Sequence, residues 1–409
     1  MLYKHYTRTI CTLEFGLFSV DILLPNSKVM GKLTLFERFR PLVKFLQLTG
    51  CLPIKTVENG WIEPIHLSKS IIGYLTWWIF SLGFTIFGII LTSQWIGVSF
   101  GEFTEAMFSF LTDSLTSQLV CAVNFSTPLF ISVWSVVHSR LKVQTLIQLL
   151  MKLEKHSSHE ANGTMIGWIL FLFLGGSLVN TLAFVIFLSR TVDANIEHLV
   201  PFAVGYYFWA LFEHLPILGY LIIFAQASSL MSQWIDSLVK ELAINEKNYL
   251  KRVQELHENG LNTMNDTFSI LAFNVIIHSL VGFTLSAYWI IDFTFQSKIE
   301  IIPKITFCFS LFIFGLMFLS LIVFLNYTSQ NVSDRVSNLK RKILNSEIQD
   351  SDTLGGIDSR FRIMHLLDSF KGFEANGFFT LGKPLMTSLT ANFLTYIVIL
   401  VQFKISENT

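Results

Sequence analysis

Hydrogen-bonding side chains lie at both ends of the last apolar segment of the chain. Thr395-Tyr396 precede five aliphatic residues, and Gln402-Phe403 follow them. On a helix with 100° between residues, the small and polar side chains share one face. That face comprises Ser388, Ala391, Asn392, Thr395, Val398, Ile399 and Gln402, with Tyr396 and Phe403 beside it. Such a stripe suits a helix that borders water, or one whose polar groups bond to neighbouring helices.

A second set of polar and aromatic side chains interrupts other apolar segments. Polar groups in lipid are costly and usually face protein or water, and aromatic walls with few polar groups are typical of small-molecule sites. The candidate pocket residues are Asn124, Asn180, Tyr207, Trp209, Glu213, His278, Tyr288 and Trp289. Two other interpretations remain open: an aromatic belt at the membrane interface, and a mutually satisfied buried pair of Glu213 with His214.

Composition excludes most other functions. The 409 residues are 52% hydrophobic and only 14% charged, whereas soluble domains carry about 25% charged residues. The formal net charge is zero, which provides no basis for binding nucleic acid. No catalytic motif is present, and the four cysteines have no metal-binding spacing. We therefore expect neither an enzyme nor a bound cofactor or metal.

Apolar runs of membrane-spanning length predict an all-α, polytopic membrane protein, since a span needs about 20 residues. The seven predicted spans are Ile71–Thr92, Leu115–His138, Met165–Ser189, Leu199–Ala227, Phe268–Phe293, Ile305–Tyr327 and Leu385–Phe403. Lys and Arg are concentrated before the first span and after the second, fourth and sixth; the intervening loops hold only Arg190, Lys298 and Lys304. Short loops rich in Lys and Arg remain on the cytoplasmic side of the membrane. We therefore expect a multi-pass plasma-membrane protein with a cytoplasmic N-terminus and an outer C-terminus, the reverse of a G-protein-coupled receptor.

The same pattern predicts four regions. Residues 1–70 would be a cytoplasmic segment with an amphipathic helix at 36–50, and residues 71–327 would hold spans one to six. Residues 328–377 would form cytoplasmic helices, with a linker at Asp350–Asp358, and 378–409 the last span with a short tail. Gly382-Lys383-Pro384 should separate this last span from the preceding helix.

Three motifs resemble the insect gustatory receptor family. They are Thr395-Tyr396 with Gln402-Phe403, Arg40-Pro41-Leu42 followed by Gly50 and Pro53, and Gly377-Phe378-Phe379. The resemblance implies a taste receptor that is a ligand-gated, nonselective cation channel in the lipid membrane. Four identical or related subunits would surround one pore, and cytoplasmic extensions of spans four to seven would form an anchor. A tastant, either a sugar or a bitter compound, would bind in the outer half of each subunit.

The resemblance also implies roles for the final segment. Gln402 and Phe403, with Ile399 nearby, would form the outer constriction, and Thr395 and Tyr396 would brace the pore helix. The sugar-receptor branch has Glu after the Thr-Tyr pair, whereas this chain has Ile397, which makes membership of that branch doubtful. Two alternatives remain: an odorant-receptor-like channel subunit that needs a co-receptor, and a secondary transporter, although no inverted repeat is visible.

Overall fold

The structure is a computed structural model, and its description covers fourteen stretches of the chain. They are residues 9–15, 18–24, 40–51, 54–56, 62–64, 67–105, 126–127, 129–138, 141–156, 164–191, 193–241, 246–295, 300–345 and 354–408. Most of the predicted second span, including Asn124, lies outside these residues; Leu129–His138 is a short apolar helix.

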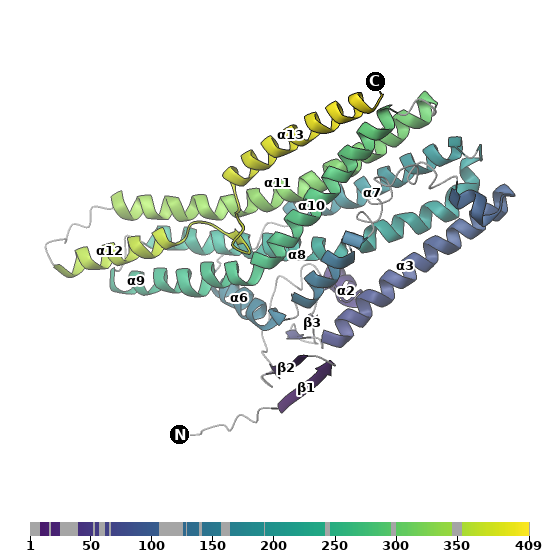
Figure 1. Ribbon diagram of the computed structural model, residues 1–409. Helices are drawn as coiled ribbons and strands as arrows, with labels where there is room; N and C mark the ends of the chain where they lie inside the picture. The colour runs from purple at the N-terminus through teal and green to yellow at the C-terminus, as the bar shows by residue number, and fades with distance from the viewer. Residues whose placement is uncertain are drawn as a thin grey trace.

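Long helices run side by side in a bundle (Figure 1). They are α3 (Leu67–Ile96), α6 (Val143–His156), α7 (Thr164–Thr191), α8 (Val200–Glu241), α9 (Glu246–Glu255), α10 (Thr263–Phe295), α11 (Ile301–Asn345), α12 (Leu354–Ser369) and α13 (Lys383–Asn408). Among the described residues, 6 helices are long and apolar enough to cross a membrane. These include the predicted first, third, fourth, fifth, sixth and seventh spans, so the predicted helical architecture is confirmed.

Several helices continue beyond the predicted spans. α8 passes the expected end at Ala227 and reaches Glu241, and α11 continues to Asn345. A short π-helix, Leu256–Asn262, joins α9 to α10. The linker expected at 350–358 is wrong from Leu354 onward, where α12 begins; residues 350–353 lie outside the described stretches. At the end of the bundle formed by α9, α12 and the last turns of α8 and α11, ion pairs join Arg252 to Glu241, Arg335 to Asp236 and Lys340 to Asp368.

Among the described residues, three short hairpins accompany the helices, and we did not predict them from the sequence. Strand β1 (Thr9–Phe15) pairs with β2 (Phe18–Leu24), β3 (Ile54–Thr56) with β4 (Ile62–Pro64), and β5 (Glu374–Ala375) with β6 (Phe379–Thr380), all antiparallel. The β5–β6 turn uses positive φ angles at Asn376 and Gly377, which Asn and Gly tolerate best.

The amphipathic helix expected at 36–50 is α2 (Arg40–Leu48). Gly50, with φ of 72°, follows its end, as a glycine in the left-handed region commonly does. α2 packs on the bundle: Leu46 is buried, and the Trp77 indole donates a hydrogen bond to the Leu48 carbonyl at 3.0 Å.

α3 and α8 approach closely at glycines. A Cβ on Gly88 would lie 2.5 Å from the Pro201 carbonyl oxygen, and one on Gly205 would lie 2.7 Å from the Thr85 Cα. The Thr85 hydroxyl donates to the Gly205 carbonyl at 2.9 Å. Small residues let helix backbones meet in this way inside membranes, and the contact fixes one wall of the cavity described next.

Candidate ligand cavity and terminal helix

A cavity of about 650 Å³ lies inside the bundle, between α3, α7, α8, α10 and α11. The helix segments that supply its lining residues lie in the half of the bundle toward which α13 runs to its C-terminus, away from α9 and α12 (Figure 1). Its volume is within the range of small-molecule sites. The cavity therefore has the size to hold a small organic ligand.

Aromatic side chains dominate the cavity wall. They are Trp78, Phe100, Phe184, Phe202, Tyr206, Trp209, Trp289, Phe307, Phe314 and Phe318. No Asp, Glu, Lys or Arg is among the described lining residues. The hydroxyl of Ser286 is already bonded to the Gly282 carbonyl of its own helix, at 2.8 Å. The wall therefore suits an uncharged, largely apolar molecule.

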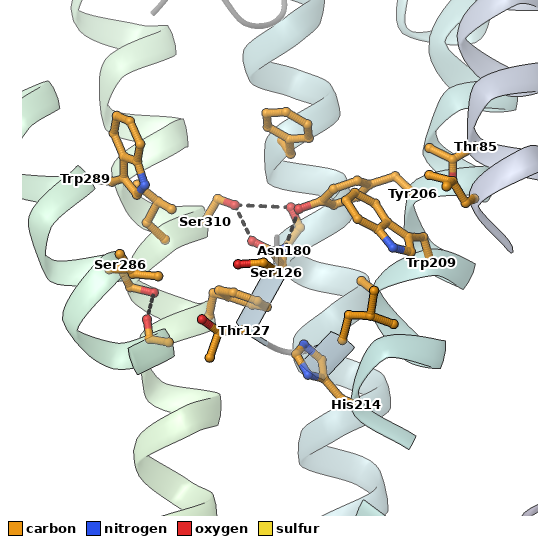
Figure 2. Close-up of a pocket in the computed structure, with 18 of the residues that line it drawn as sticks. Thr85, Ser126, Thr127, Asn180, Tyr206, Trp209, His214, Ser286, Trp289 and Ser310 are labelled. Atoms are coloured by element: carbon orange, nitrogen blue, oxygen red, sulfur yellow. Dashed lines mark hydrogen bonds between the residues drawn. The ribbon is translucent and has the colours of Figure 1, made fainter. Parts of the chain in front are cut away.

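A polar network crosses one side of the cavity (Figure 2). The Ser310 hydroxyl on α11 donates to the Asn180 side-chain oxygen on α7 at 2.5 Å, and the Asn180 amide donates to the Tyr206 hydroxyl on α8 at 3.5 Å. Asn180 and Ser310 are buried. The three side chains satisfy one another and tie α7, α8 and α11 together.

A histidine pair lies at another part of the wall. The His214 Nδ1 on α8 is 3.0 Å from the His278 Nε2 on α10. Both rings are buried, at 2% and 1% exposure. The rings of Phe173, Phe314 and Phe318 surround His214, so the pair bonds to itself inside an apolar shell.

The predicted pocket residues divide into three groups. Asn180, Trp209, His278 and Trp289 line the cavity. Tyr207 and Tyr288 are not among its described lining residues; Tyr206 is the lining tyrosine. The Glu213 side chain and Asn124 are outside the described parts, and the described partner of His214 is His278. Sequence reasoning overlooked Thr85, Ser286 and Ser310, which look ordinary in apolar helices.

α13 lies against α10 and α11 along one edge of the bundle (Figure 1). Its apolar face packs inward: Leu385 and Leu389 are buried, and the Phe393 ring contacts that of Phe283 on α10 at 4.6 Å. Every member of the predicted small and polar stripe is exposed: Ser388, Ala391, Asn392, Thr395, Val398, Ile399 and Gln402. Phe403 is 58% exposed. The Thr395 hydroxyl donates to the Ala391 carbonyl of its own helix at 3.0 Å, and the exposed stripe faces away from the other described helices of this chain.

Both ends of α13 are tied to the bundle. At its start, the Gly382 N–H donates to the Asn326 side-chain oxygen at 2.7 Å, and the Lys383 N–H donates to that of Gln330 at 3.1 Å. Gly382 has φ of 135°, so the predicted helix break is confirmed. Near the other end, Lys404 pairs with Asp292 of α10 at 2.8 Å.

Metal or thiol chemistry finds no support in the described residues. They contain no group of three or more His, Cys, Asp and Glu side chains able to hold a metal ion. Burial raises the pKa of the Cys51 thiol to about 12, despite an opposing hydrogen bond with Thr49. This cysteine is therefore a protonated core side chain at neutral pH.

Comparison with known proteins identifies the family of this chain and a solved fold that it resembles. Residues 39–407 match the family described as 7tm Chemosensory receptor. The fold resembles that of the insect olfactory receptor OR5 from Machilis hrabei, with a TM-score of 0.58 and 12% identity over 90% of this chain and 99% of that chain. The same receptor in complex with eugenol gives a TM-score of 0.57 with the same identity and coverage. No curated protein matches the sequence. The family match spans nearly the whole chain, and the chain belongs to the 7tm chemosensory receptor family.

Proposed function

We propose that this protein is a subunit of a ligand-gated, nonselective cation channel, opened by a small molecule in the cavity. The observation that carries the proposal is the uncovered polar stripe of α13. Its own chain leaves the stripe exposed, and hydroxyl and amide groups facing lipid would be unfavourable. Four copies arranged with these stripes inward would place them around an aqueous pore.

The orientation follows from loop charge. Lys and Arg are concentrated in the loops at the α9 and α12 end, which we assign to the cytoplasm by the positive-inside rule. The cavity and Phe403 then lie in the outer half of a plasma-membrane protein. The exposed, bulky Phe403 and Ile399 provide a hydrophobic constriction, which can gate by excluding water.

α10 is the element that can couple the two sites. It lines the cavity with Trp289, and one turn later Asp292 pairs with Lys404 of α13. A ligand that fits the cavity better when α10 is displaced would shift the population toward that arrangement. α13 would move with α10, and the constriction would widen.

The Thr395-Tyr396 and Gln402-Phe403 motif favours a taste receptor over an odorant receptor. The apolar, uncharged cavity favours a bitter or other largely apolar compound over a sugar, whose many hydroxyls need partners. An odorant-receptor-like subunit is the second candidate, because two similar solved structures are of an insect olfactory receptor. Currents recorded with and without an added co-receptor subunit distinguish the two.

The test is electrical recording from cells that express the chain, with a panel of bitter and apolar compounds. Phe403→Ala and Gln402→Ala should alter basal or ligand-evoked current at equal surface expression. Phe309→Ala is the matched control, because Phe309 on α11 is similarly exposed, at 51% against 58% for Phe403. Unchanged gating and permeation in both α13 variants would count against the pore assignment, and saturable uptake without current would indicate a transporter.

A further inference from the structure

Among the described residues of the cavity wall, the His214–His278 pair and the Trp78 indole contain buried nitrogens without a hydrogen-bond partner. Thr85, Asn180, Ser286 and Ser310 each have a protein partner. By contrast, the His214 Nε2 and the His278 Nδ1 are buried and have no hydrogen-bond partner among the described residues. Buried polar atoms are rarely left in this state, so these two nitrogens are candidates for an external partner.

The pair has a fixed hydrogen-bonding capacity whichever tautomer it adopts. Each neutral imidazole carries one N–H and one bare nitrogen. One hydrogen is used in the contact between His214 Nδ1 and His278 Nε2. The remaining hydrogen must then lie on one of the two outer nitrogens, and the other outer nitrogen is an acceptor. The pair can therefore serve either a donor or an acceptor by shifting protons between tautomers.

The surroundings define the rest of the ligand. Figure 2 shows the His214 ring projecting among the lining side chains, on a different side from the Asn180–Ser310 network. Phe314 and Phe318 flank the pair and also line the cavity. With no charged side chain among the described lining residues, an ionised ligand would lose its hydration without compensation.

We propose that His214 and His278 are the specificity-determining polar end of the cavity, and that they select an uncharged aromatic ligand bearing a hydroxyl group. The hydroxyl suits either tautomer, since it can donate to the bare nitrogen or accept from the N–H. The aromatic wall binds the ring by stacking and edge contacts. This inference rests on the cavity being the ligand site of the proposed function, and it names the ligand's chemistry.

The test measures binding of two probes of matched shape to the purified full-length protein in lipid nanodiscs. 2-Naphthol carries the hydroxyl, and 2-methylnaphthalene replaces it with a methyl group. The quantity compared between variants is the ratio of their dissociation constants, in which partitioning into lipid cancels. The double variant His214→Leu, His278→Leu should reduce the preference for 2-naphthol by about tenfold, the size of one hydrogen bond with a buried partner.

Two further variants make the comparison specific. Thr181→Val removes a buried hydroxyl that bonds its own helix, at the Ser177 carbonyl, away from the cavity lining, and should leave the ratio unchanged. His278→Gln keeps hydrogen-bonding groups and should retain part of the preference. If the double variant fails to fold, NMR of the wild-type protein with ¹⁵N-labelled histidine tests the role of the pair. 2-Naphthol should shift two buried imidazole resonances, and 2-methylnaphthalene should not.

The outcomes separate this inference from the channel proposal. An unchanged ratio in the double variant, absent imidazole shifts, or no binding of 2-naphthol would overturn the role of the pair, even if other ligands evoke current. A histidine-dependent preference without any evoked current would support the pair and contradict the channel proposal.

Discussion

α8 and α13 are both apolar helices of spanning length, but their environments are opposite. In the most apolar window of His214–Glu241 on α8, 94% of the residues are buried inside the chain, whereas the figure for α13 is 11%. α8 contacts α3, α11, α7, α6 and α10, while α13 contacts mainly α10 and α11. A helix that is apolar on every side can be a core element or can face lipid, so apolarity alone does not distinguish a scaffold from a working surface.

The largest expected effect comes from the buried helix. Trp234 of α8 is fully buried and stacks on His156 of α6, with ring centroids 4.3 Å apart. Trp234→Ala should lower the free energy of unfolding by about 3–5 kcal/mol, because it leaves a large cavity. Thermal and denaturant unfolding of the purified protein would measure the loss.

The matched change on α13 is Leu394→Ala, at a side chain that is 61% exposed and outside the polar stripe. It should change the unfolding free energy of the subunit by less than about 0.5 kcal/mol. Equal losses at Trp234 and Leu394 would break the comparison, because they would mean that α13 is as deeply packed in solution as α8.

A smaller effect is expected where α8 meets α3. Gly205→Ala would place a Cβ 2.7 Å from a backbone atom of Thr85, which cannot rotate away, so the two helices must separate. We expect a loss of about 1–3 kcal/mol, as for other overpacked sites. Gly175→Ala is the control, because a Cβ on Gly175 meets nothing within 4 Å; equal melting temperatures for the two variants would contradict the close approach.

These contrasts show what sequence could and could not reveal. The break at Gly382 and the shared face of Thr395 and Gln402 follow from residue type and helical period, and the structure contains both. The continuation of α8 and α11 beyond their membrane-length runs was also expected, as cytoplasmic helical extensions, and the structure contains both. The His214–His278 contact joins residues 64 positions apart and has no local signature. The β5–β6 hairpin does have one, the Asn376-Gly377 turn with positive φ at both residues, and it was overlooked.

The ion pair between Lys404 and Asp292 tests how strongly the C-terminal end of α13 is attached to α10. The Lys404 and Asp292 side chains are 19% and 11% exposed, between the exposed and fully buried limits for ion pairs. Lys404→Met should lower stability by about 1 kcal/mol and shift the ligand dose dependence of any current. The exchange Asp292→Lys with Lys404→Asp should restore both; failure to restore either would show that charge pairing is not what holds the helix.

The smallest expected effect is on the pH dependence of stability, at the contact between His156 of α6 and Trp234 of α8. Burial lowers the pKa of His156 below 6.5, with nearby Arg252 and Lys155 adding to the shift and Glu255 opposing it. The unfolded chain therefore binds more protons than the folded protein once the pH falls below about 6.5, and stability must decrease there. His156→Phe keeps an aromatic ring against Trp234 without a titrating group, so its melting temperature should fall less between pH 7 and pH 5 than that of the parent. Since α13 has no comparable buried histidine among its described residues, a pH response that persists unchanged in His156→Phe would place its origin outside this contact.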